Sequence, residues 1–172
     1  MGNKEKPTRI LGLDPGLNIT GYGVIEVAGN VPKVIEAGVV RGGSSSTGSL
    51  AERVKTLYDG IEDVIASLAP TVVAVEQLYS HYERPKTAIL MGHARGVLLL
   101  AASRAGLPVL DYASTQVKRM LTGNGRAPKS QMQQSVRLQL NLEAVPDPPD
   151  VADALAIALC HFFFTRIPAS LK

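Results

Sequence analysis

The stretch Ile10–Glu26 reads ILGLDPGLNITGYGVIE, and it decides the fold class more than any other part of the chain. A short apolar run, Arg9–Asp14, ends in an acid and is followed by Pro15-Gly16, a pair that favours a turn. The segments Gly21–Val27 and Lys33–Val40 are rich in strand-forming residues and are joined by a Gly-Asn pair. The N-terminal part therefore predicts a three-stranded meander whose first strand ends in a carboxylate.

Helices and strands alternate through the rest of the chain, which predicts a mixed α/β fold. Ser49 starts a helix as a capping box with Glu52, and Pro70 ends it. The further elements that we expect are a strand over Thr71–Val75 closed by Glu76, a helix over Lys86–Ala105, a strand over Leu107–Tyr112, helices over Thr115–Leu121 and Ser130–Leu142, and a last helix from Asp150 to about Thr165. The length of 172 residues suits one globular domain, with flexible tails at 1–8 and 166–172.

Composition limits the classes of function. Hydrophobic residues make up 45% of the chain, and Cys160 is the one cysteine, so no intrachain disulfide can form. The first residues lack the apolar run of a signal peptide. The most apolar long stretch, Thr87–Ser103, contains His93 and Arg95, so it predicts a buried helix and not a membrane span. We therefore expect a cytoplasmic protein that has no membrane partner.

The charges are unevenly distributed, although the net charge is only +3. Residues 84–142 contain nine Lys or Arg residues and one acid, Asp111, whereas acids outnumber bases on both sides of this segment. A basic surface beside an acidic site suits a phosphodiester substrate. Solvated helix faces are the alternative explanation, and charge alone does not exclude it.

Two acids come at the ends of apolar strands. Asp14 follows the run Ile10–Leu13, and Glu76 follows the run Val72–Val75. If the two strands are parallel neighbours, both carboxylates lie at the same edge of the sheet, where the Cβ atoms of opposed residues are about 4.5–5.5 Å apart and two anions repel each other. Protonation of one acid or a cation between them relieves this repulsion, and a divalent ion is the usual solution.

Asp150 and Asp153 form a second acidic pair, three residues apart at the start of an expected helix, so they share one face. The residues around Asp153 are apolar on all sides, which predicts a buried helix on which a charged carboxylate needs a partner or a metal. If this pair faces Asp14 and Glu76, the four acids form an all-oxygen pocket that favours Mg²⁺ or Mn²⁺.

Purely structural roles are an alternative for three of these acids. Asp14 suits the first position of a turn, because Asp favours that position. Asp150 suits a helix N-cap, and Asp153 suits a first helical turn, where a negative charge complements the helix dipole. Glu76 has no obvious partner in the sequence, and the four acids together are harder to explain in this way.

Five segments resemble the crossover-junction endonucleases of the RuvC type. In chain order they are ILGLDPGLNITGYGVIE, VAVEQLY, GHARGVLLLAA, STQVKRMLTGNGRAPKSQMQ and DVADALAIAL, and the match runs from about Ile10 to about His161. The resemblance implies a ribonuclease-H-like fold with a five-stranded mixed sheet flanked by helices. It also implies a homodimer that resolves four-way (Holliday) junctions by symmetric nicking in DNA recombination and repair, working with a branch-migration motor complex.

The resemblance also implies the residues of the active site. The metal-binding catalytic tetrad would consist of Asp14, Glu76, Asp150 and Asp153. In members of the family the position of Asp150 can be His. We expect two Mg²⁺ ions, or Mn²⁺, in an in-line phosphodiester hydrolysis in which Asp14 bridges the ions.

DNA contacts are expected from the basic segment and the residues just before it. The candidates are Tyr79, Arg84, Lys86, Lys118 and Lys129. By resemblance, Lys118 and Lys129 would bind phosphates near the scissile bond, and Tyr79 would stack on or wedge between bases. A packed aromatic at the rim is the alternative for Tyr79, and solvated charges at a helix start explain Arg84 and Lys86 equally well.

Two other classes of protein remain alternatives. A phosphotransferase of the actin and sugar-kinase type also begins with an acid-Gly turn, but it needs two such domains and a second phosphate loop. A non-catalytic junction-binding module, in which the acids serve stability alone, would differ in having no metal-dependent nicking.

The histidines and one pair of glycines allow further expectations. His81, His93 and His161 have no metal-ligand spacing, and we expect His93 to be packed in the core or in an interface. Gly92 and Gly96, four residues apart on the expected central helix, suit either a dimer contact or packing against the sheet.

Overall fold

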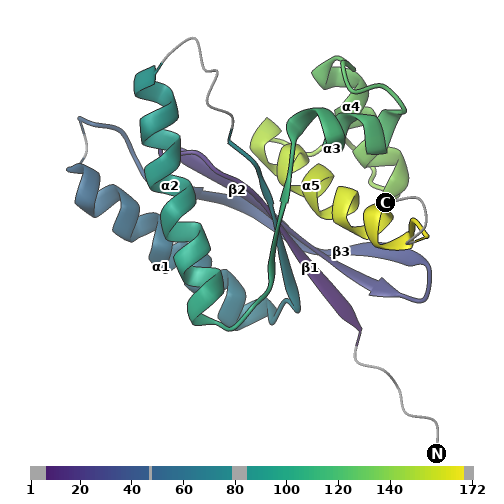
Figure 1. Ribbon diagram of the computed structural model, residues 1–172, viewed down its shortest axis with the longest axis horizontal. Helices are drawn as coiled ribbons and strands as arrows, with labels where there is room; N and C mark the ends of the chain where they lie inside the picture. Colours follow the sequence, from purple (N-terminus) through teal and green to yellow (C-terminus); the bar gives the residue numbers. More distant parts are fainter. Residues whose placement is uncertain (1–6, 47, 79–84, 169–172) are drawn as a thin grey trace, which may run out of the picture.

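A five-stranded mixed sheet forms the centre of the computed structural model, which describes residues 7–46, 48–78 and 85–168 (Figure 1). The strands are β1 (Thr8–Asp14), β2 (Ile19–Ala28), β3 (Val31–Arg41), β4 (Val72–Glu76) and β5 (Val109–Tyr112), in the order β3-β2-β1-β4-β5. The first three strands pair as an antiparallel meander, whereas β4 is parallel to both β1 and β5. The predicted meander and five-stranded mixed sheet are confirmed.

Helices cover both faces of this sheet (Figure 1). One face carries α1 (Leu50–Leu68) and α2 (Pro85–Arg104). The other face carries α5 (Pro149–Arg166), which also packs against α3 (Ser114–Thr122) and α4 (Lys129–Gln139). The molecule therefore has three layers, with the sheet in the middle.

The alternation of side chains along the central strands explains these layers. Leu11 and Leu13 of β1 pack with α1 and α2, whereas Ile10 packs with α5 on the opposite face. The same alternation separates Val73 and Val75 of β4 from Val72 and Ala74. Because both faces of β1 and β4 are covered, these two strands are apolar almost throughout.

Local signals in the sequence fix the start and the end of α1. The Ser49 side chain accepts a hydrogen bond from the Glu52 amide, and the Glu52 carboxylate accepts one from the Ser49 amide at 2.7 Å. This is the predicted capping box, which satisfies amides that the first turn of a helix leaves without partners. At the other end, Ala69 caps the helix in the left-handed conformation, and the predicted stop residue Pro70 follows it directly.

Several boundaries differ from the prediction by one to three residues. α4 ends at Gln139 and not at Leu142, because the backbone turns at Asn141, whose φ is 51°. The expected tails were too long: Thr8 already belongs to β1, and Arg166 belongs to α5, where it donates to the Phe162 and Gly29 carbonyl oxygens. The outer parts of both tails, 1–6 and 169–172, lie outside the described residues.

The expectation that the stretch from 87 to 103 is a buried helix is wrong for one face of α2. Ala94 and Leu98 are buried, but Ile89 is 62% exposed and Leu100 is 50% exposed. Apolar residues occur on both sides of this helix, so periodicity does not show which side packs. Within the described ranges, no helix combines the length and the hydropathy needed to cross a membrane.

Candidate active site

The carboxyl ends of β1 and β4 bring the first two predicted acids together. The strands are parallel neighbours in a register that pairs Leu13 with Val75, so Asp14 and Glu76 are the next residues along each strand. Each strand is anchored by buried apolar residues up to this point, and the carboxylate follows where the burial becomes incomplete. The sequence-based expectation of parallel strands with an acid at the end of each agrees with this arrangement.

The second acidic pair comes from the start of α5, which crosses β1 and β2 on the opposite face from α2. Most residues from Val151 to Phe162 are buried, as predicted for a helix that is apolar on all sides. Asp153 is an exception, with 17% of its side chain exposed. Asp150 lies one turn earlier, so both acids face the same end of the sheet as Asp14 and Glu76.

Glycines in β1 and β2 allow α5 to approach the sheet closely. A Cβ atom added at Gly12 would lie 2.1 Å from the Ala154 carbonyl oxygen, and one added at Gly21 would lie 2.1 Å from the Asp150 carbonyl oxygen. In the β1–β2 register, Gly21 is the partner of Asp14. The absence of a side chain at Gly21 therefore lets the backbone of Asp150 sit directly beside Asp14. The sequence analysis missed this role, although the alternate glycines in GYG were a visible signal.

The four acids share one electrostatic environment. Burial, together with the charges of Glu76, Asp153 and Asp150, raises the pKa of Asp14 to about 8, while the charge of Lys129 opposes this rise. The pKa of Glu76 is raised by burial and then by Asp153. The pKa of Asp153 is raised mainly by burial, against a lowering by its hydrogen bond with Lys129. A site with this much unfavourable negative charge favours either protons or bound cations.

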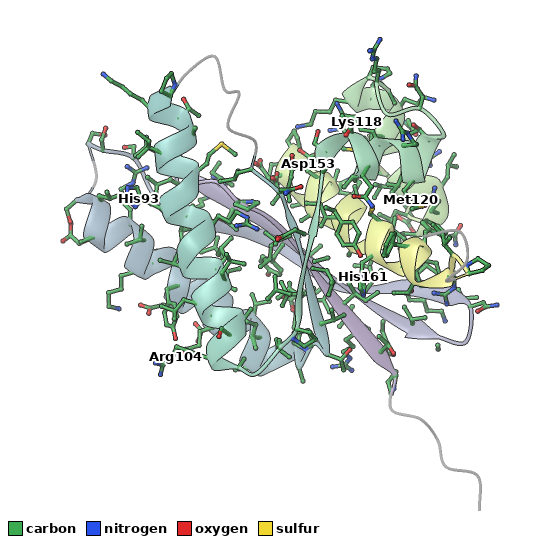
Figure 2. All side chains as sticks on the ribbon, viewed as in Figure 1. His93, Arg104, Lys118, Met120, Asp153 and His161 are labelled. Carbon is green, nitrogen blue, oxygen red and sulfur yellow. The ribbon has the colours of Figure 1, made fainter. Side chains whose placement is uncertain are left out.

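Lysines border the acids on one side. The Lys129 Nζ donates to Asp153 Oδ2 at 2.7 Å, and this hydrogen bond raises the pKa of Lys129. Lys118 projects from α3 on the same side of the molecule as Asp153 (Figure 2). A cavity of about 200 Å³ is lined by Glu76, Ser114, Val117, Lys118, Lys129, Met132, Asp153 and Ile157. An anionic substrate entering this cavity would meet both lysines beside the acids.

The residues of the site fit a hard divalent cation. The Asp153 Oδ1 atom is buried and has no hydrogen-bond partner among the described residues, so this carboxylate oxygen is available to coordinate a cation. Carboxylate oxygens are the donors that Mg²⁺ and Mn²⁺ prefer. Within the described ranges, however, no three acidic, His or Cys side chains already converge as a ligand set. Mutual repulsion opposes a closer approach of the carboxylates, and a bound cation would offset this repulsion.

The other sequence predictions about the site have different outcomes. Lys86 is exposed at the start of α2, whereas Tyr79, Arg84 and His81 lie outside the described residues. His161 lies far along α5 from Asp153, and its Nδ1 is 2.7 Å from the Tyr112 hydroxyl (Figure 2). His93 is exposed, so the core alternative for this histidine is wrong, whereas the interface alternative stays a prediction.

The predicted alternative in which Gly92 and Gly96 pack against the sheet is wrong. Both glycines are exposed, and a Cβ atom at either position would have no neighbour within 4 Å. They are therefore available on the surface of α2, together with the exposed side chains of Ile89 and Leu100.

A sheet of this order, with acids at the ends of its central strands and lysines beside them, defines a metal-dependent nuclease of the ribonuclease-H-like class. The family model of the crossover junction endodeoxyribonuclease RuvC matches residues 10–161. The chain belongs to this family, which agrees with the resemblance seen in its sequence. Family membership excludes the phosphotransferase alternative.

Individual relatives agree with this assignment. The chain is 55% identical over 159 residues to the crossover junction endodeoxyribonuclease RuvC of Rhodopirellula baltica, a match that covers 92% of this chain and 88% of the relative. It is also similar to the RuvC structure of Thermus thermophilus, with a TM-score of 0.85, 36% identity and coverage of 93% and 96% of the two chains. The structure of that protein in complex with a Holliday junction substrate gives a TM-score of 0.86, also at 36% identity, with the same coverage of both chains.

Proposed function

We propose that this protein resolves four-way (Holliday) DNA junctions by metal-dependent, symmetric nicking, with Asp14, Glu76, Asp150 and Asp153 as its metal ligands. The observation that carries the proposal is that two acidic strand ends lie at the same end of the sheet as the acidic start of a buried helix, beside the cavity lined by Lys118 and Lys129. The proposal extends to this chain the substrate of the Thermus thermophilus relative.

The four acids would hold Mg²⁺, or Mn²⁺, and we infer two ions for each site. Bound there, the ions supply an activated water and stabilise the charge on the leaving oxygen of the phosphodiester. Asp14 would be the central ligand of this set, because the charges of Glu76, Asp153 and Asp150 all act on its carboxyl group. Cation binding would release the proton that Asp14 otherwise holds near neutral pH.

Lys129 and Lys118 would bind the phosphates next to the scissile bond. In the protein without DNA, the Lys129 ammonium group is paired with Asp153. A phosphate oxygen offers the same kind of acceptor, so Lys129 can exchange Asp153 for the substrate and thereby orient the phosphodiester. Tyr79, Arg84 and Lys86 remain predicted contacts with the DNA.

A homodimer is the second part of the proposal, because a four-way junction has two equivalent strands to cut. The exposed side of α2 carries Ile89, Gly92, His93, Gly96 and Leu100 at helical spacing. An exposed apolar stripe with two glycines allows a second helix to approach closely. Pairing of this face with its copy would relate two active sites by a two-fold axis. A branch-migration motor as partner and a cytoplasmic location stay predictions.

Cleavage of a synthetic four-way junction in Mg²⁺ tests the proposal. We expect paired nicks at symmetric positions on opposite strands, and no cleavage of a linear duplex of the same sequence. Asp14→Asn should reduce the cleavage rate at least about 100-fold, equivalent to about 2.7 kcal/mol of transition-state stabilisation. Its affinity for the junction in Ca²⁺ should be nearly unchanged, since the phosphate contacts remain.

Asp63→Asn, which changes an exposed acid on α1, is the matched control and should cleave like the wild-type protein. Junction binding without nicking by the wild-type protein would instead support the non-catalytic binding module. Loss of binding in Asp14→Asn with cleavage unaffected would refute the assignment of Asp14.

A further inference from the structure

Arg95 lies on α2, but its guanidinium group points into the end of the sheet. Its side chain is only 19% exposed. The Nε atom donates to the Glu76 carbonyl oxygen at 3.3 Å, and the Nη2 atom donates to the Asp111 carboxylate in an ion pair. One side chain therefore joins α2 to the ends of β4 and β5, at the backbone of a proposed metal ligand.

The direction of the β4 backbone shows why Glu76 needs a donor. The amides of Val73 and Gln77 donate to carbonyl groups on the β5 side of the sheet. Backbone groups of alternate residues in a strand point in opposite directions, so the N–H and the carbonyl of Glu76 point toward β1. The carbonyl of Glu76 is therefore directed at the point where β1 ends.

Pro15 removes the donor that would otherwise stand there. The parallel register pairs Leu13 with Val75, and its continuation would bring the amide of residue 15 to the Glu76 carbonyl. Proline has no N–H, so the Asp14-Pro15 sequence that ends β1 leaves this carbonyl without a ladder partner. The Arg95 side chain, which comes from α2, donates a hydrogen bond to this carbonyl in place of the missing amide.

Asp111 fixes the guanidinium group in this position. It is the only acid between residues 84 and 142, and it stands opposite Val75 in the β4–β5 register. A charge-assisted pair of this kind is more directional than a contact made by an unpaired arginine. The two contacts of Arg95, with Asp111 and with the Glu76 carbonyl, therefore fix the end of β4 relative to α2.

We propose that Arg95 is a positioning residue for the nuclease reaction, which holds the backbone of Glu76 so that its carboxylate is presented to Asp14 and Asp153. The inference rests on the proposed function of these acids. Arg95 acts through Glu76 and touches neither the substrate nor the reacting atoms. Outer contacts that orient metal ligands commonly change metal affinity about 10–100-fold when they are removed.

Mn²⁺ binding to the DNA-free protein, measured by calorimetry, tests this role independently of cleavage. Arg95→Gln should weaken Mn²⁺ binding about tenfold and raise the Mg²⁺ concentration for half-maximal junction cleavage by a similar factor. Its affinity for the junction in EDTA should stay within about twofold of the wild-type value, because no phosphate contact changes. Arg95→Lys keeps the charge and one donor and should recover part of the loss, and Asp111→Asn should give an intermediate shift.

Arg104→Gln, on the exposed last turn of the same helix, is the control and should match the wild-type protein in every measurement. Unchanged Mn²⁺ affinity in Arg95→Gln would overturn the proposal. It would also be overturned if junction binding and thermal stability fell in parallel with the Mn²⁺ affinity. If Arg95→Gln does not fold, Arg95→Lys and Asp111→Asn decide by the same criteria. A wild-type protein that binds Mn²⁺ but does not nick junctions would overturn the proposed function. The comparison of Mn²⁺ affinities between wild type and variants would still test whether Arg95 positions Glu76.

Discussion

Asp14 connects the protonation of the site with the stability of the protein. Its carboxyl group has a pKa of about 8 in the folded protein, against an ordinary value of 3.8, because burial and the neighbouring acids disfavour its charge. Between these two values the folded protein holds a proton that the unfolded chain releases. The stability from this group is therefore complete below about pH 4 and is lost as the pH rises toward 8.

Asp14→Asn should remove this pH-dependent loss of stability in the metal-free protein. In EDTA we expect the variant to unfold at higher urea concentration than the wild-type protein at pH 8, and at about the same concentration at pH 4. A weaker pH dependence should remain, because burial also raises the pKa of Glu76 and of Asp153. Equal stability of the two proteins at pH 8 would show that Asp14 is not held in an unfavourable environment.

At the scale of elements, the contact between α5 and the strands β1 and β2 decides how near the two acidic pairs come. Gly21 and Gly23 lie on the same face of β2, but an added methyl group would meet different obstacles. At Gly21 it would meet the backbone of Asp150 at 2.1 Å, whereas at Gly23 it would meet the tip of the Leu155 side chain at 2.6 Å. A side-chain tip can move by rotation, but a helix backbone moves only as a unit.

Gly21→Ala should therefore shift the start of α5 away from Asp14. We expect it to lower the free energy of unfolding by about 1–3 kcal/mol, as overpacking of a core does. It should also raise the Mg²⁺ concentration for half-maximal cleavage about tenfold or more, since the two acidic pairs separate. Both quantities follow from urea unfolding and from cleavage rates at varied Mg²⁺.

Gly23→Ala is the matched variant on the same strand and face. It should lose stability by a similar amount and keep the metal dependence of the wild-type protein, because Leu155 can yield without movement of the helix. Identical metal dependence in both alanine variants would argue against glycine as the determinant of the approach of α5.

At the scale of the whole molecule, the exposed apolar side chains of α2 and α4 differ in their setting. The exposed stripe of α2 includes Ile89 at 62% and Leu100 at 50% exposure, beside two glycines at which an added Cβ atom would have no neighbour within 4 Å. Leu138 on α4 is 68% exposed, but it stands on a helix whose first residue, Lys129, faces the acidic site. We therefore assign only the α2 face to the pairing of two copies.

Ile89→Asp should convert the dimer to a monomer at micromolar concentration, as measured by analytical ultracentrifugation. Burying an unpaired carboxylate at a two-fold contact costs at least about 2 kcal/mol for each subunit. Leu138→Asp makes the same change at an exposed leucine elsewhere and should leave the molecular mass unchanged. A monomeric wild-type protein, or a dimer that persists in Ile89→Asp, would contradict the assignment of this face.

Much of the fold was predictable because it depends on short-range signals. The capping box at Ser49, the turn at Pro15-Gly16 and the apolar runs that end in Asp14 and Glu76 all belong to neighbouring residues, and each gives the expected element. The apolar surroundings of Asp153 predicted a buried helix, which α5 is. Three of the acids were recognisable because Asp14 and Glu76 each end an apolar run and Asp153 stands within an apolar segment, where a charge is costly.

The tertiary structure alone decided how these segments meet. Alternation predicted strands but not that Gly21 would face the Asp150 backbone, since such contacts join residues far apart in the chain. Apolar residues on both sides of α2 left open which face packs, and Arg95 gained its role only because Pro15 lacks an amide at the end of a neighbouring strand. Sequence patterns record what each segment prefers locally, whereas the direction of a side chain toward a distant partner is fixed only when the layers pack.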